Sequence, residues 1–137
     1  QFHNITIDLK IDRDPLVSCF PAKLSQVFMN IIVNACQAIE TRQLSEPLLS
    51  GLIEITIRTD NYQVIVEFKD NGCGMDEQTQ KKIFDPFYTT KDVGTGTGLG
   101  MSISFGIIEE HYGFIELKST PNIGTELTIY LPTKQNN

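Results

Sequence analysis

The sequence predicts a two-layer α/β sandwich, in which a five-stranded mixed sheet carries three helices on one face. Five segments alternate apolar and polar residues with period two, which is typical of strands with one buried face. These strands alternate with helical segments in the order strand, helix, hairpin, short helix, loop, helix, hairpin. Mostly antiparallel strands with helices on one side form two layers around one core.

The five predicted strands are defined by their alternation. A turn at Asp60-Asn61 joins the second strand to the third, and Gly124-Thr125 opens the fifth, so each pair reads as a hairpin. The fourth strand runs from Phe114 to Lys118. The apolar positions of the other four are Ile5, Ile7, Leu9 and Ile11, then Ile53, Ile55 and Ile57, then Val64, Val66 and Phe68, and finally Leu127, Ile129 and Leu131.

Three helices are predicted between these strands. The first begins at Pro21, a residue suited to a first helical turn, and runs to about Arg42. A short helix from Asp76 to Phe84 has acidic residues in its first turn and lysines in its last, as the helix dipole favours. A third runs from about Gly98 to His111. The segment from Asp85 to Gly98 has no periodicity and is predicted to be a long functional loop.

The composition is that of one ordinary globular domain. The chain has 137 residues, with 40% hydrophobic and 20% charged, which fits a single domain spanning residues 1–137. It begins with Gln1, so we expect it to be a fragment of a longer protein. Cys19, Cys36 and Cys73 are widely spaced and predict reduced thiols rather than a zinc site or a disulfide framework.

Charge and hydropathy exclude two classes of partner. The net charge is −6 and no cluster of Lys or Arg occurs, so nucleic acid is not an expected ligand. No apolar run reaches the roughly 20 residues needed to cross a bilayer, and no signal peptide is present. We therefore expect a cytoplasmic domain. If the parent protein is anchored in a membrane, such as the inner membrane, the anchor lies in parts of the parent outside this chain.

A narrow polar stripe interrupts the apolar first helix. Asn30, Asn34, Gln37 and Thr41 follow one another at helical spacing on one face. Buried carboxamides need partners, because an unpaired polar group costs about 1–3 kcal/mol. A bound ligand is one source of partners, and an asparagine oxygen is a hard donor that suits Mg²⁺. The alternative is that these side chains bond to the backbone and serve the fold alone.

An acid followed by two glycines ends the third strand. Asp70 is followed by Gly72 and Gly74, which permits a tight turn and a close approach of the backbone to a ligand. The same residues can also form a simple turn without a ligand.

Glycines recur at every second position before the third helix. Gly94, Gly96, Gly98 and Gly100 lead directly into its N-terminus, where free N–H groups and the helix dipole favour a phosphate. The segment is neither a P-loop nor a dinucleotide fingerprint, since Gly-Lys-Ser/Thr and the βαβ context are missing. A flexible connector of no function is the alternative.

Taken together, these pieces resemble the N box, the two glycine boxes and the intervening F box of sensor histidine kinases. That family belongs to the Bergerat nucleotide-binding fold, shared with DNA gyrase, ninety-kilodalton heat-shock chaperones and mismatch-repair ATPases. The resemblance runs from about Gln26 to Leu131. The run Phe87-Tyr88-Thr89-Thr90-Lys91 is similar in particular to kinases of the nitrogen-regulatory type.

The resemblance implies a role for each motif, with ATP and Mg²⁺ as cofactors. It implies that Asn34 binds the magnesium ion, that Asn30 faces the phosphates or a water, and that Asp70 accepts a hydrogen bond from the adenine amine. Gly72 and Gly74 would let the strand end turn beneath the base, and Met75 would pack on it. The remaining implied residues are Phe84 and Phe87 as lid anchors, Lys91 on a phosphate, and Gly96, Thr97, Gly98, Leu99 and Gly100 along the triphosphate.

The resemblance also implies a protein histidine kinase, whose phosphoacceptor histidine is absent from this chain. It implies that phosphate passes to a histidine on a dimerisation domain of the same protein, in a homodimeric parent, and then to a response regulator. His3 and His111 are better read as ordinary surface or boundary residues.

Two other functions remain open. The related clamp ATPases carry a glutamate base where this chain has Asn30, and a carboxamide cannot accept the proton of an attacking water. This favours a kinase over a clamp ATPase. A non-catalytic module that binds nucleotide only to switch conformation is the third possibility, because fold and activity separate.

Overall fold

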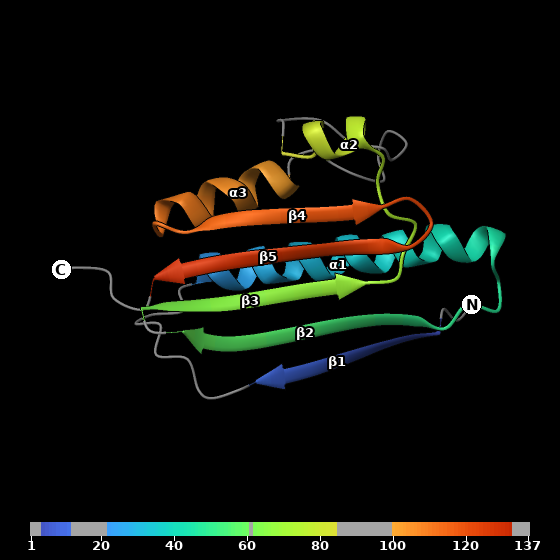
Figure 1. Cartoon of the computed structure of the whole chain (residues 1–137), viewed down its shortest axis with the longest axis horizontal. Helices are drawn as coiled ribbons and strands as arrows, with labels where there is room; N and C mark the ends of the chain where they lie inside the picture. Colours follow the sequence, from blue (N-terminus) through green and yellow to red (C-terminus); the bar gives the residue numbers. More distant parts are fainter. Residues whose placement is uncertain (1–3, 12–21, 61, 85–99, 133–137) are drawn as a thin grey trace.

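The computed structural model of the chain describes residues 4–11, 22–60, 62–84 and 100–132 (Figure 1). Its elements follow the predicted order of strand, helix, hairpin, short helix, helix and hairpin. They are β1 (Ile5–Ile11), α1 (Ala22–Ser45), β2 (Gly51–Asp60), β3 (Gln63–Asp70), α2 (Glu77–Lys82), α3 (Gly100–Glu110), β4 (Phe114–Thr120) and β5 (Gly124–Pro132).

The strands form one five-stranded sheet in the order β1-β2-β3-β5-β4. β1 pairs with β2 in parallel, and the other three pairings are antiparallel, so the predicted mixed sheet is confirmed. Because β5 inserts between β3 and β4, the ends of β3 and β5 lie side by side although the two helices α2 and α3 separate them in the chain (Figure 1). This adjacency brings the turn after Asp70 next to the β4–β5 turn.

The core lies between one face of the sheet and the helices α1 and α3. The register aligns alternate residues across the strands, for example Ile55 with Phe68 and Phe68 with Leu127. These positions are buried, and the Phe28 ring of α1 lies 5.9 Å from the Phe68 ring. Each such side chain contributes about 1.5–3 kcal/mol of burial free energy. The buried α1 residues that pack on the sheet are Leu24, Val27, Ile31, Ala35 and Ile39.

The observed helices differ from the predicted ones mainly at their ends. α1 runs to Ser45, one turn beyond the predicted end. α2 is shorter than predicted at both ends. Asp76 is its N-cap, because the Asp76 carboxylate accepts a hydrogen bond from the Thr79 N–H at 2.8 Å, and Ile83 is its C-cap. α3 ends at Glu110, and the predicted starting residues Pro21 and Gly98 lie outside the described residues.

β1 departs from the expectation of a buried apolar face. Its apolar residues do share one face, the face that carries the helices in the rest of the sheet, because Ile7 and Leu9 pair with Ile53 and Ile55. Ile7, Leu9 and Ile11 are nevertheless about half exposed, at 51%, 55% and 48%. β1 is an edge strand, whereas α1 packs over β2 and β3, so the alternation predicted the face correctly and its burial wrongly.

The face of the sheet opposite α1 is polar towards the Asp70 end, whereas Ile65 and the stacked Phe114 and Tyr130 rings lie on it towards the other end. One row of paired residues crosses it and alternates in charge, from Glu54 through Lys69 and Glu126 to Lys118. Lys69 and Glu126 approach to 4.0 Å, and these exposed pairs contribute little to stability. They keep this end of the face solvated. No helix among the described residues is both long and apolar enough to cross a bilayer.

Candidate functional site

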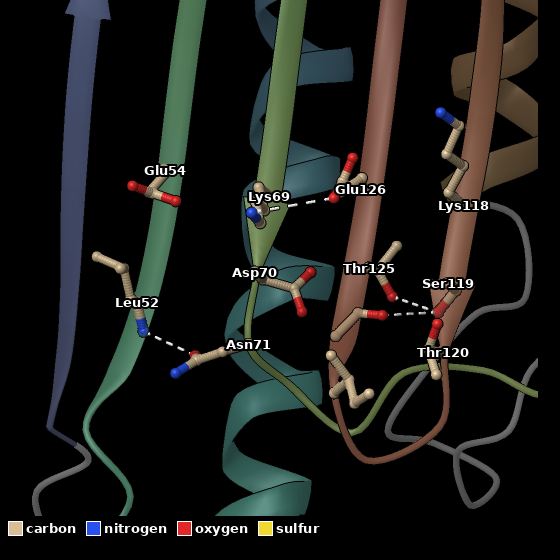
Figure 2. A pocket seen from close by; sticks show the side chains of 12 residues that line it. Leu52, Glu54, Lys69, Asp70, Asn71, Lys118, Ser119, Thr120, Thr125 and Glu126 are labelled. Carbon is tan, nitrogen blue, oxygen red and sulfur yellow. Dashed lines mark hydrogen bonds and ion pairs between the residues drawn. The ribbon is translucent and has the colours of Figure 1, made fainter.

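The site is built around Asp70, the last residue of β3. Its register partners are Ile53 on β2 and Thr125 on β5, so its side chain belongs to the face that carries the helices. Figure 2 shows the Asp70 carboxyl between the ends of β3 and β5, beside Thr125. The carboxylate accepts hydrogen bonds from the Gly72 N–H at 2.8 Å and from the Thr125 N–H. Burial raises the pKa of Asp70 to about 6, although both hydrogen bonds act to lower it.

The turn after Asp70 packs closely against α1 and the β4–β5 turn. The Cys73 N–H donates to the Ala38 carbonyl at 3.0 Å, and the Asn122 N–H donates to the Cys73 carbonyl at 2.7 Å. A Cβ on Gly72 would lie 2.7 Å from the Cβ of Ala38, so only glycine fits there. The sequence predicted a close approach of the backbone at this turn, and the structure shows that its partners include α1 and the β4–β5 turn.

A substitution at Gly74 tests how much the turn after Asp70 depends on glycine. Its φ is +69°, and a Cβ there would lie 2.0 Å from the Thr120 carbonyl oxygen. We expect Gly74→Ala to lower the free energy of unfolding by about 2–4 kcal/mol, measured by urea denaturation. Gly106→Ala is the matched control, because a Cβ added to this helical residue would meet no atom within 4 Å. It should raise stability by about 0.5–1 kcal/mol, and equal effects of both changes would contradict the prediction.

A network of polar groups links β4, β5 and the start of α2. The Ser119 hydroxyl accepts from the Met75 N–H at 2.8 Å, and it contacts the Thr125 hydroxyl at 2.7 Å and the Gly124 carbonyl at 3.1 Å (Figure 2). The Gln80 amide donates to the Met75 carbonyl at 2.9 Å and to the Ser119 carbonyl at 3.0 Å. These bonds hold Met75, a predicted site residue, at the edge of the Asp70 pocket.

The polar stripe of α1 continues from this turn towards α3. Asn30, Asn34 and Ala38 lie four residues apart on one side of α1, and Ala38 contacts the turn after Asp70. The side of α1 that runs from Ala38 through Asn34 to Asn30 is about 12 Å long at 1.5 Å per residue. The Asn30 amide donates to the Ser104 hydroxyl of α3 at 3.3 Å, and Ser104 is fully buried. Asn34 is exposed.

Phe84 lies where the predicted lid begins. Its ring is half-buried and packs against the Phe105 ring of α3, with centroids 5.2 Å apart. Gly100 is the first residue of α3, so Phe84, which comes just before the predicted lid, packs against the helix that begins just after it. The other predicted site residues, Phe87, Lys91, Gly96, Thr97, Gly98 and Leu99, lie outside the described residues.

The structure describes the predicted metal ligand, the carboxamide of Asn34. Its exposed position and hard oxygen fit Mg²⁺, which takes few protein ligands and shares substrate phosphates. Within residues 4–11, 22–60, 62–84 and 100–132, no three His, Cys, Asp or Glu side chains gather into a metal site. Among the described residues, Cys36 and Cys73 are free cysteines.

Three residues of the site were missed at the level of sequence. Thr125 and Ser119 belong to the Asp70 pocket because β5 lies beside β3 and β4, an order of strands that the alternation of apolar residues does not specify. Arg42 was predicted only as a helix end, yet it binds the turns on both sides of the pocket. The Gly124-Thr125 pair was the available signal, since it opens a strand of the predicted second hairpin.

The hollow seen in Figure 2 includes part of this site. It is lined by Asp70, Ser119 and Thr125, and also by Glu54, Lys69, Lys118 and Glu126, which stand on the face opposite α1 and balance one another in charge. A triphosphate on that face would meet as many carboxylates as ammonium groups. The described features that suit an adenine nucleotide, namely the Asp70 carboxyl and the α1 stripe, lie on the helix side.

Comparison with known proteins agrees with this geometry. The family model described as histidine kinase-, DNA gyrase B-, and HSP90-like ATPase matches residues 20–135. Sporulation kinase E of Bacillus subtilis (strain 168) is 42% identical over 127 residues, which cover 92% of this chain and 16% of that protein. Signal transduction histidine-protein kinase AtoS of Escherichia coli (strain K12) is 46% identical over 110 residues, covering 80% of this chain and 16% of that protein.

A solved structure shows the same fold. The catalytic domain of histidine kinase ThkA superposes with a TM-score of 0.76 at 32% identity, over 95% of this chain and 80% of that one. The chain spans about a sixth of the length of these two curated relatives. The resemblance to the ATP-binding domain of sensor histidine kinases is confirmed, whereas the nitrogen-regulatory type stays a prediction. The chain belongs to the family of histidine kinase-, DNA gyrase B- and HSP90-like ATPases.

Proposed function

We propose that this domain binds Mg-ATP and supplies its γ-phosphoryl group to a histidine on a dimerisation domain outside residues 1–137. The observation that carries the proposal is the placement of Asp70. Its carboxylate is held by two backbone N–H groups at one end of the α1 stripe that leads to Asn34 and Asn30. Ala38, beside the Asp70 turn, and Asn30 lie about 12 Å apart along α1, which suits a base at one end and phosphates at the other.

Adenine recognition follows from the chemistry of a carboxylate. The exocyclic amine of adenine donates hydrogen bonds, whereas guanine carries an oxygen at the same position. Asp70 as a carboxylate is an acceptor only, so it binds the amine and repels the oxygen. A site built to bond one polar group rejects a ligand that lacks it. The domain should therefore bind ATP and ADP and reject GTP.

The phosphates would lie between the α1 stripe and the N-terminus of α3. Asn34 would hold Mg²⁺, which supplies charge neutralisation at the phosphates. Lys91 would bind a phosphate, and the glycines that precede α3 would present N–H groups at its N-terminus. Asn30, which bonds to Ser104, would contribute an amide and no base. Positioning and charge neutralisation are the main requirements of phosphoryl transfer.

The side chain at position 30 supports a kinase over a clamp ATPase. A self-contained ATPase needs a general base for the attacking water, a contribution of about 10²–10⁴ in rate. The Asn30 carboxamide cannot accept that proton, and its amide donates to Ser104. A kinase does not need a base here, because the nucleophilic histidine arrives on another domain.

His111 is not placed to be that nucleophile. Its Nδ1 lies 2.8 Å from the Ile107 carbonyl oxygen, which can only accept, so Nδ1 carries the hydrogen. The bond ties the ring to the last turn of α3, at the start of β4 and away from the Asp70 turn (Figure 1). The phosphoacceptor would therefore come from the dimerisation domain of a homodimeric parent, and a response regulator would receive the phosphate afterwards.

Labelling of the full-length parent protein with ATP tests this function directly. We expect the full-length parent to form phosphohistidine, labile to acid and stable to base, when it is incubated with γ-labelled ATP. The 137-residue chain alone should bind ATP without labelling itself. Rapid ATP hydrolysis by the chain alone would instead establish a clamp ATPase. Tight ATP binding with no labelling of the parent would establish a nucleotide-dependent switch.

A further inference from the structure

Arg42, in the last turns of α1, binds the turns on both sides of the Asp70 pocket. Its guanidinium Nη1 donates to the Asn71 carbonyl at 3.0 Å and to the Ile123 carbonyl at 3.2 Å. Its Nε donates to the Glu46 carboxylate at 3.0 Å. The Arg42 side chain is 17% exposed, whereas that of Glu46 is 46% exposed. Arg42 thus joins α1 to the turn after β3 and to the turn between β4 and β5.

The Asn71 carbonyl belongs to the peptide unit that also carries the Gly72 N–H. That N–H donates to the Asp70 carboxylate at 2.8 Å. A peptide unit is planar, so a hydrogen bond to its carbonyl fixes the direction of its N–H. A cation bonded to the carbonyl also polarises the unit and strengthens the N–H as a donor. Arg42 therefore acts on the Asp70 carboxylate through one peptide plane.

The second N–H on Asp70 is held in the same way. The Thr125 N–H shares its peptide unit with the Gly124 carbonyl, which accepts from the Ser119 hydroxyl at 3.1 Å (Figure 2). The Ser119 hydroxyl has a single hydrogen. When it donates that hydrogen to the Gly124 carbonyl, the Thr125 hydroxyl must be the donor in the 2.7 Å contact between the two hydroxyls. In both peptide units that donate to the carboxylate, the carbonyl is therefore held by a side chain. The charged Arg42 bonds to the Asn71 carbonyl, and the neutral Ser119 bonds to the Gly124 carbonyl.

We propose that Arg42 is a positioning residue for adenine recognition, because its guanidinium holds the Asn71–Gly72 peptide with the N–H aimed at the Asp70 carboxylate. The proposal rests on the proposed function, since the orientation of the carboxylate matters for ligand choice only if it binds adenine. Arg42 orients only one of the two N–H donors to Asp70. Loss of Arg42 frees the Gly72 N–H and leaves the Ser119-anchored Thr125 N–H in place.

Few other charges act on Asp70 among the residues that the structure describes. On α1 the titratable neighbour is Cys36; burial first, then the charges of Glu40 and Asp70, raise the pKa of its thiol. The nearest charges on the strands, Lys69 and Glu126, stand on the opposite face and pair with each other at 4.0 Å. From β5 and the turn after β3, the groups that reach the carboxylate are neutral N–H donors.

Titration of Asp70 in the nucleotide-free chain tests the proposal. Arg42→Met keeps the apolar stem and removes the guanidinium, and Arg42→Lys restores a charged donor. Glu46→Gln is the matched control, because it removes the exposed ion pair of Arg42 and leaves the bonds to the two turns. The carboxyl carbon NMR signal of Asp70 is followed from about pH 4 to about pH 8, a range that brackets its titration.

We expect Arg42→Met to raise the pKa of Asp70 by about half to one unit, the effect of weakening one charge-assisted hydrogen bond. The Glu46→Gln curve should match the wild type, and Arg42→Lys should lie between wild type and Arg42→Met. The ratio of ATP to GTP affinity should fall about three- to tenfold in Arg42→Met and stay unchanged in Glu46→Gln.

The two readouts separate this proposal from the proposed function. Unchanged Asp70 titration in both Arg42→Met and Arg42→Lys overturns the role of Arg42, even when the chain binds ATP. Equal shifts in Arg42→Met and Glu46→Gln also overturn it, because the ion pair rather than the peptide would then be responsible. Failure of the wild type to prefer ATP over GTP sinks the proposed function instead, whatever Asp70 does in the titration. If Arg42→Met fails to fold, Arg42→Lys and Glu46→Gln decide the question.

Discussion

Replacing Asp70 with alanine is expected to weaken ATP binding about 10- to 100-fold, the loss of one charged hydrogen bond of about 1.5–3 kcal/mol. The wild type should bind ATP and not GTP, and the variant should no longer distinguish the two. The Gly72 and Thr125 N–H groups would also lose their acceptor. Calorimetric titration of both chains with both nucleotides measures all four affinities. Equal binding of ATP and GTP by the wild type would contradict adenine selection by Asp70.

The acidity of Asp70 predicts a pH dependence for the same interaction. Burial raises its pKa to about 6, so the side chain is mostly ionised at neutral pH and mostly neutral at pH 5. A protonated carboxyl retains one oxygen acceptor but loses the charge that strengthens the bond. ATP affinity should therefore fall as the pH drops through about 6. The nucleotide titrates in the same range, so the Asp70→Asn chain supplies the control: its profile contains only the contribution of the nucleotide.

The raised pKa also predicts that Asp70 destabilises the nucleotide-free fold. An acid whose pKa is about 6 in the folded chain and 3.8 as a reference binds protons more tightly when folded. Stability is therefore lost as the pH rises from about 4 to about 6 and is not recovered above that range. Asp70→Asn should raise the free energy of unfolding at pH 8 by about 1–2 kcal/mol, after allowance for partial solvent screening. The gain should vanish below about pH 4.

The opposite signs of these two effects make the test specific. If Asp70 served only the fold, changing it would lower the stability of the protein. Asp70→Asn should instead raise the stability and lower the affinity for ATP. Stabilising changes that cost function are expected where a site is held in an unfavourable state. A variant that loses both stability and ATP binding would indicate a structural role for Asp70 alone.

The sequence predicted the helices and strands better than it predicted which of them lie side by side. Period-two alternation is local, so the five strands, their order along the chain and the Asp70 turn could be predicted. The pairing of β3 with β5 is not local, and it alone places Thr125 beside Asp70. The long side chain of Arg42 looked like an ordinary basic helix end, because its two carbonyl partners lie 29 and 81 residues away.

Burial was the other quantity that the pattern could not supply. β1 has the alternation of a half-buried strand, yet its apolar residues are exposed because no described helix covers the sheet edge. That Asn30 faces the phosphates or a water stays a prediction, and the structure adds a protein partner, since the Asn30 amide donates to Ser104. A polar stripe on a helix shows that partners exist and does not show which ones they are.

Replacing Asn34 with alanine should lower phosphoryl transfer in the full-length parent at least about 100-fold, because the metal that neutralises the phosphates would lose its protein ligand. Asn34 is exposed on a helix, where alanine has the higher helix propensity, so the chain should stay folded and its unfolding midpoint should not fall. Val33→Ala is the matched control, since Val33 is the exposed neighbour on the solvent side of α1. It should leave phosphoryl transfer unchanged.

The dependence on metal concentration distinguishes a lost ligand from a disturbed helix. If Asn34 binds Mg²⁺, Asn34→Ala should require a higher Mg²⁺ concentration for half-maximal ATP binding, and Mn²⁺, which binds carboxamide and phosphate oxygens more tightly, should recover part of the activity. A disturbed helix would weaken ATP binding at every metal concentration and would also lower the unfolding midpoint. If Asn34→Ala matches the wild type in both metal dependence and transfer, the phosphates alone hold the ion and Asn34 is no ligand.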